Sequence, residues 1–156
     1  MTPYEAVSRI GKQLHGVPAT SRDIQVLRHF FSETLMPDWF LALLMDFGLA
    51  GTYFSLDLDE DQSGVGADVL WLTPEQMISE ARDSEPGLSI MSSGFIPVGA
   101  CAQGSGDPYF LDLRDMSANP PFVRVPHDYA GGSSYPLHKI EVVLSSLSEF
   151  FVRSKL

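Results

Sequence analysis

The chain has 156 residues, of which 44% are hydrophobic and 19% charged, a balance typical of a folded domain and not of a disordered chain. Ten basic and twenty acidic side chains give a net charge of −10, which disfavours nucleic acid and anionic membranes as direct ligands. The single cysteine excludes an intramolecular disulfide framework. We therefore expect one acidic domain over residues 1–156, with no signal or membrane-spanning segment, in the cytoplasm.

The first 48 residues carry the hydrophobic periodicity of helices. Apolar residues recur at helical spacing in residues 3–14, and a second set in residues 21–35 lies on one helical face. Pro37 is expected to start a third helix, with Gly48 as its C-terminal cap. The pattern predicts three helices before the first strand.

From Gly51 onward, short segments rich in β-branched and aromatic residues alternate with turns rich in Gly or Pro. They predict five strands, at residues 52–56, 69–72, 95–100, 109–114 and 122–125. Thr73, Pro74 and Gln76 have the pattern of a capping box, so a short helix should follow the second strand and end near Arg82.

The chain is expected to close with a helix whose apolar face is made by four residues, Leu144, Leu147, Phe150 and Phe151. Helices first, then strands in sequence and then a helix predict the α+β class. We expect an antiparallel sheet of about five strands. Helices at the N-terminus, one short middle helix and the C-terminal helix should pack on one side of it.

The negative charge is concentrated in the middle of the chain. Residues 46–115 hold thirteen of the acidic side chains and only two basic ones. The densest group is Asp57, Asp59, Glu60 and Asp61. This group is either a solvated loop that aids solubility or a platform that attracts a cationic partner, because a field of one sign steers association.

The same loop has a partial likeness to a calcium site. Over residues 57–68, oxygen-bearing side chains occupy positions 1, 3, 5, 7 and 12, as in an EF-hand loop. However, position 6 is Gln62 where the sharp turn needs glycine, and position 12 is the short Asp68. The flanking residues also indicate strands, so calcium binding stays a remote alternative and no metal site is predicted.

A second turn of interest contains Gly104, Gly106 and Asp107 before Pro108. The glycines permit a tight turn, and the proline moves Asp107 out of the helical region. The Asp107 carboxylate either fixes this turn or belongs, with Asp112, to a rim that faces a ligand.

Catalytic patterns are weak. Cys101, His127 and Asp128 could form a nucleophile, base and orienting acid, but their spacing does not show that they meet. The sequence contains no phosphate-binding loop, dinucleotide fingerprint or nucleophile elbow. We expect no enzymatic activity and no cofactor.

Four segments resemble one family when they are taken in order. They are MPDWFLALLMDFG (36–48), VLWLTPEQM (69–77), GFIPVGACAQGSGDPYFLDL (94–113) and SSLSEFF (145–151). Together they resemble the SUKH superfamily, the Smi/Knr-type domain of bacterial toxin-immunity proteins and fungal cell-wall regulators. Residues 1–35 match less well. The asparagine-glycine usual after the first helix of the family is replaced here by residues 48–51.

The resemblance implies an α+β fold and a binding protein without catalysis. In bacterial members it implies the neutralisation of a polymorphic toxin, often a nuclease. Our hypothesis is that an acidic surface covers the basic active-site surface of a toxin domain. The expected binding residues are Asp57, Asp59, Glu60, Asp61, Asp107 and Asp112 for charge, with Tyr53, Phe54 and Tyr109 as aromatic anchors. The alternative is a regulator or scaffold of the same fold, and in either case a monomer or weak homodimer.

Overall fold

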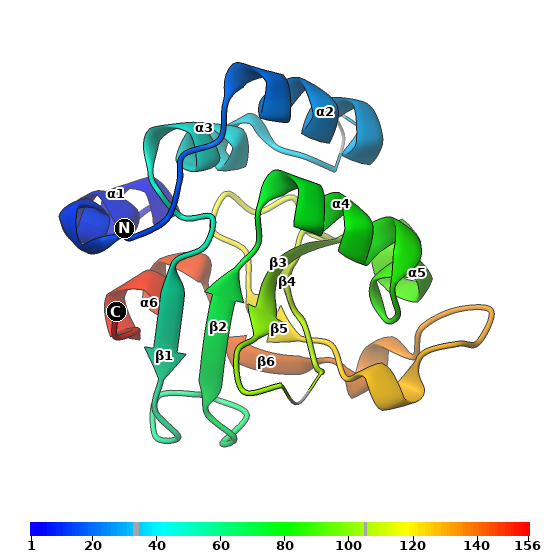
Figure 1. Ribbon diagram of the computed structural model, residues 1–156. Helices are drawn as coiled ribbons and strands as arrows, with labels where there is room; N and C mark the ends of the chain where they lie inside the picture. Colours follow the sequence, from blue (N-terminus) through cyan, green and yellow to red (C-terminus); the bar gives the residue numbers. More distant parts are fainter. Residues whose placement is uncertain (33–34, 105) are drawn as a thin grey trace.

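Figure 1 shows the computed structural model, which describes residues 1–32, 35–104 and 106–156. The helices are α1 (Pro3–Ile10), α2 (Ser21–Phe31), α3 (Asp38–Asp46), α4 (Pro74–Asp83), α5 (Gly87–Ile90) and α6 (Leu147–Arg153). Short 3-10 turns are η1 (Gly11–Gln13), η2 (Met91–Ser93), η3 (His127–Tyr129) and η4 (Leu137–Lys139). The strands are β1 (Tyr53–Leu56), β2 (Ala67–Trp71), β3 (Phe95–Cys101), β4 (Tyr109–Asp112), β5 (Phe122–Arg124) and β6 (Glu141–Leu144). The predicted α+β class is confirmed.

Local sequence signals start three of the helices. Thr2, Thr20 and Thr73 each accept a hydrogen bond from the third backbone N–H of α1, α2 and α4, and the third side chain reaches back to the cap. Each such cap stabilises its helix by about 1 kcal/mol. The capping box predicted at Thr73 and Gln76 is therefore confirmed. Helix α2 ends at Phe31, and residues 33 and 34 of its predicted span lie outside the described residues.

Helix α3 begins after Pro37 as predicted, but Gly48 is not its cap. The helix ends at Asp46, and Phe47 takes the C-cap position with extended backbone. The Gly48 carbonyl instead accepts the Gly16 N–H at 3.0 Å and the Thr52 hydroxyl at 2.7 Å. Gly48 thus ties the segment before α2 to the start of the sheet.

The sheet is an antiparallel meander in the order β1-β2-β3-β4-β5-β6. The prediction of about five strands missed β6, which pairs Val142 with Val123 and Leu144 with Phe122. Leu144 therefore lies in a strand and not on the closing helix, which begins only at Leu147. Among the described residues, no helix combines the length and apolar character needed to cross a bilayer.

Alternate strand residues serve two cores. Ile96, Leu111 and Phe122 lie in register and belong to the larger cluster, together with buried residues of α1, α2, α3, α4 and α6. Phe110 and Val123, also in register, belong to a smaller cluster on the opposite face. That cluster is completed by Phe95, Ile90 of α5, Val125 and Tyr135. The helices other than α5 thus cover one face, and the 125–140 segment covers part of the other.

The sheet curls so that its two ends approach one another. Gly99 lies at an irregularity between β3 and β4, where a Cβ atom would stand 2.5 Å from Val69 Cγ1. The outer edge of β1 pairs with Lys155 through two backbone hydrogen bonds at Ser55. At the far end, Val143 of β6 accepts the N–H of Gln62, which lies in the β1–β2 loop. Both edges are therefore partly covered, which opposes edge-to-edge association.

Candidate protein-binding surface

The β1–β2 loop, residues 57–66, is the densest acidic segment and is here named the closing loop. The closing loop connects β1 with β2, and between them it reaches across to β5 and β6 at the other end of the curled sheet. Its backbone bonds Val143 through Gln62, and the Gln62 amide also bonds the Ser145 hydroxyl at 2.8 Å. The loop is thus part of the packed structure rather than a solvated excursion.

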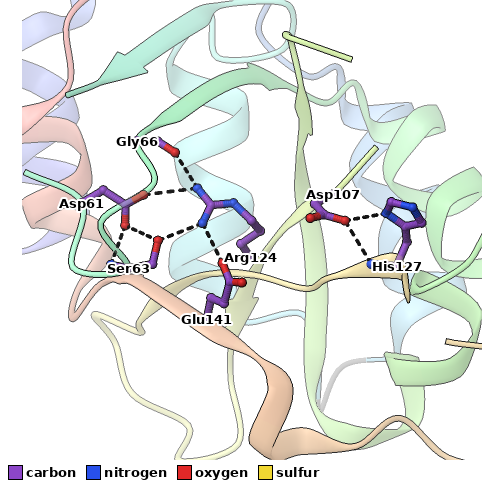
Figure 2. Close-up of polar contacts among 7 residues, drawn as sticks. All are labelled: Asp61, Ser63, Gly66, Asp107, Arg124, His127 and Glu141. Carbon is purple, nitrogen blue, oxygen red and sulfur yellow. Dashed lines mark hydrogen bonds and ion pairs between the residues drawn. The ribbon is translucent and has the colours of Figure 1, made fainter. Parts of the chain in front are cut away.

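Arg124 of β5 holds the closing loop in place, as Figure 2 shows. One terminal nitrogen donates to the Asp61 carboxylate at 3.2 Å and to the Gly66 carbonyl at 2.6 Å. The other donates to the Ser63 hydroxyl and to Glu141, both at 2.9 Å. The Arg124 side chain is 6% exposed and that of Asp61 0% exposed, so this is a buried ion pair.

The electrostatics of Arg124 keep it charged. Burial acts to lower its pKa, but the Tyr109 phenol, Glu141 and Asp61 outweigh burial, and the pKa of Arg124 is raised. The Arg124 guanidinium also lies 5.3 Å from the Tyr109 ring centroid. Burial in turn raises the pKa of Tyr109, so its phenol stays protonated at neutral pH. Arg124 is therefore a structural cation with its donors directed inward.

Three predicted binding residues are wrong because they are buried. The Asp61 carboxylate accepts hydrogen bonds from Arg124 and from Ser63. The Ser63 N–H and hydroxyl each donate to it at 2.7 Å. Phe54 is fully buried and packs against Trp71 and two phenylalanines of α6. Tyr109 is buried beside Phe122, stacked at 5.5 Å. Asp61 and Phe54 are therefore not presented to a partner, and only 2% of Tyr109 is exposed.

Two other predicted carboxylates lie away from the closing loop. Asp107 accepts the backbone N–H of His127 at 3.0 Å and contacts its ring Nδ1 at 2.5 Å, so it joins the turn before β4 to the segment after β5 (Figure 2). This hydrogen bond with Asp107 is the main cause of a raised His127 pKa. Asp112, at the opposite end of β4, pairs with Arg114 at 2.7 Å. The six predicted acidic residues therefore do not form one rim.

The remaining predicted residues stay on the surface. Asp57 pairs with Lys155, and Glu60 pairs with Arg153 at 2.9 Å. Asp59 is exposed, and the described part of the chain offers it no ion pair. Tyr53 is also exposed and donates its hydroxyl to Asp68. That hydrogen bond is the largest cause of the raised Tyr53 pKa.

The structure adds apolar residues that the sequence reasoning missed. Leu58 and Val65 are 61% and 62% exposed on the closing loop. Leu70 is exposed directly opposite Tyr53 on the outer face of β1 and β2. In the sequence, the signal that could have identified this surface is the presence of two apolar side chains, Leu58 and Val65, in an otherwise acidic loop. We name Tyr53, Leu58, Val65 and Leu70, with the carboxylates Asp57, Asp59 and Asp68 around them, the hairpin face.

Negative charge is in surplus around the hairpin face. Seven acidic residues and three basic ones lie at this end of the molecule, and ion pairs join five of the acidic residues to the three basic ones, which leaves Asp59 and Asp68 without a basic partner among the described residues. The acidic residues are Asp57, Asp59, Glu60, Asp61, Asp68, Glu141 and Glu149, and the basic ones are Arg124, Arg153 and Lys155. Ion pairs fix several of these carboxylates in position, but they leave a net negative charge at this end of the molecule.

The structure argues against the calcium and nucleophile alternatives. Asp61 and Ser63, expected at positions 5 and 7 of a calcium loop, are both committed to Arg124. Within residues 1–32, 35–104 and 106–156, no group of three metal-ligating side chains could hold an ion. The His127 ring nitrogens face Asp107 and Asp128, at 2.5 and 3.3 Å, so neither is directed at Cys101.

Comparison of the chain with models of known protein families, with curated proteins and with solved structures finds no significant match.

Proposed function

We propose that this chain is a SUKH-type immunity protein of the cytoplasm that binds a basic toxin domain and blocks its active-site surface. The observation that carries the proposal is the hairpin face, where exposed apolar side chains are surrounded by carboxylates. Protein interfaces have this composition, with aromatic and aliphatic anchors at the centre and a polar rim. The four segments that resemble the family support the same reading.

The mechanism is occlusion, without a catalytic step. A toxin that cleaves a polyanion, such as a nuclease, needs a cationic cleft to hold its substrate. The surplus negative charge around the hairpin face attracts such a cleft and speeds the encounter. Leu58 and Val65 then bury against the toxin and slow dissociation, which keeps the substrate out.

A growth-protection assay tests this function. Proteins encoded next to the gene for this chain are expressed as isolated C-terminal domains, with and without the chain. Protection by the wild-type chain is expected from one of them. The double variant Leu58→Ser with Val65→Ser should lose protection, because it removes the apolar contacts proposed with the toxin. Both side chains are exposed, so the substitutions should leave the fold unaffected.

The matched control is Met116→Ser, which replaces an apolar side chain that is also exposed but lies beyond the C-terminal end of β4, away from the hairpin face. It should protect as well as the wild type. If no adjacent product is toxic and neutralised, the immunity function is wrong, and the regulatory or scaffold alternative takes its place.

A further inference from the structure

A groove of about 410 Å³ opens beside the hairpin face. The closing loop forms one wall through Leu58 and Val65, and the turn after β3 forms the other through Gln103. Tyr109 and Arg124, which are almost fully buried, also contribute to its lining. The backbone N–H of Ala102 donates to the Asp68 carbonyl at 2.9 Å, which fixes the turn after β3 to the start of β2. The groove is therefore lined by residues of five strands, β1 to β5, together with the closing loop and the turn after β3.

The walls suit an aliphatic chain. Leu58 and Val65 are apolar, exposed and part of the lining, and a Cβ atom at Gly66 would stand 3.3 Å from Leu58 Cδ2, so Leu58 packs against Gly66 beside the groove. Methylene groups of a long side chain can bury against such a wall at about 25 cal/mol for each Å² removed from water.

The charges at the groove favour a cation. Asp57 and Asp68 line it and carry negative charge. The positive charge of Arg124 is offset by both Asp61 and Glu141, which contact its two terminal nitrogens. Lys155 pairs with Asp57, so four carboxylates stand against two cations here, and the summed field attracts positive charge.

We propose that this groove receives a lysine or arginine side chain of the partner protein, with its stem against Leu58 and Val65 and its cationic end at Asp68. The inference rests on the proposed function for its biological role, but the groove can be tested without the partner. The proposal also makes Asp68 the residue that selects a cationic side chain at the hairpin face.

The test uses the whole chain and n-butylguanidinium, which is a guanidinium on a four-carbon chain, in a ¹⁵N–¹H NMR titration. n-Butylguanidinium should shift the amide signals of Leu58, Val65 and Gln103, whereas the neutral n-butylurea should not. Asp68→Asn keeps an oxygen that can accept the Tyr53 hydroxyl but removes the charge. It should weaken n-butylguanidinium binding about fivefold, the factor that one unit charge at about 4 Å gives in water.

Asp115→Asn is the matched control, because Asp115 is an exposed acid beyond the far end of β4. Equal weakening by the two variants, or n-butylguanidinium shifts spread over the surface, would overturn the groove assignment. Growth protection is scored separately with the same variants. Specific n-butylguanidinium binding without protection by any adjacent toxin would refute the immunity function alone. Protection that Asp68→Asn leaves intact would refute the use of the groove by the partner.

Discussion

Replacement of Arg124 by methionine should destabilise the protein more than any other single change in the charged network. The substitution removes four hydrogen bonds and leaves Asp61, whose side chain is 0% exposed, as a buried carboxylate without a cation. Breaking a buried ion pair from one side costs about 3–5 kcal/mol. We expect the lower end, about 3 kcal/mol, because Ser63 still donates two hydrogen bonds to Asp61.

The measurement is urea unfolding followed by tryptophan fluorescence, with the slope of the transition required to stay unchanged. Glu141→Gln is the comparison variant, because Glu141 is partly exposed and should contribute less than about 1 kcal/mol to the free energy of unfolding. The double variant Arg124→Met with Asp61→Asn should recover about 1 kcal/mol relative to Arg124→Met alone, since no charge stays buried. An Arg124→Met variant no less stable than Glu141→Gln would refute the role of Arg124 in holding the closing loop.

Three further predictions concern other parts of the molecule. Burial raises the pKa of Glu80 to about 7, so folding favours its protonated form, and stability should fall as pH rises from about 4.5 to 7. Glu80→Gln should therefore be about 1 kcal/mol more stable than the wild type at pH 8, measured by urea unfolding, and no gain would refute this. Asp107→Asn should lower the pKa of His127 toward 6.5, read from its ring-proton shifts by NMR. The stabilisation from this pair is present below about pH 6.5 and is lost as pH rises through the raised pKa, and an unchanged titration would contradict it. Gly99→Ala should lower the free energy of unfolding by about 1–3 kcal/mol, measured by thermal unfolding, because its Cβ would crowd Val69. An unaltered Tm would show that the sheet can shift to accommodate the Cβ and would contradict this prediction.

Elements with a strong local signal could be predicted from the sequence. The capping box at Thr73 identifies the start of α4 without any tertiary information. Strand β6 shows the opposite case. Leu144 continues the spacing of Leu147 and Phe150, so helical periodicity extends across the boundary. Only the pairing of β6 with β5 makes residues 141–144 a strand, and a partner nearly twenty residues away leaves no local mark.

The candidate site was harder to predict for the same reason. In β5, Phe122 faces the larger core, and strand alternation places Arg124 on that face too. A basic residue at such a position signals a buried cation that needs carboxylates. Its partners could not be assigned, because Asp61 lies 63 residues before Arg124. The acidic run was visible in the sequence, but its division into buried and exposed carboxylates depends on the curl of the sheet.

That division separates two contributions to binding. Long-range attraction depends on the summed charge at the hairpin end, and an internal ion pair such as Glu60 with Arg153 contributes nothing to that sum. The carboxylates in excess of the basic residues do contribute to that sum, so the association rate should fall as the salt concentration rises. Dissociation depends instead on what is desolvated at contact, which in the proposed complex is Leu58, Val65 and a cation beside Asp68. A salt-sensitive association rate together with a salt-insensitive loss of affinity in the Leu58→Ser variant is therefore the kinetic pattern that this surface requires.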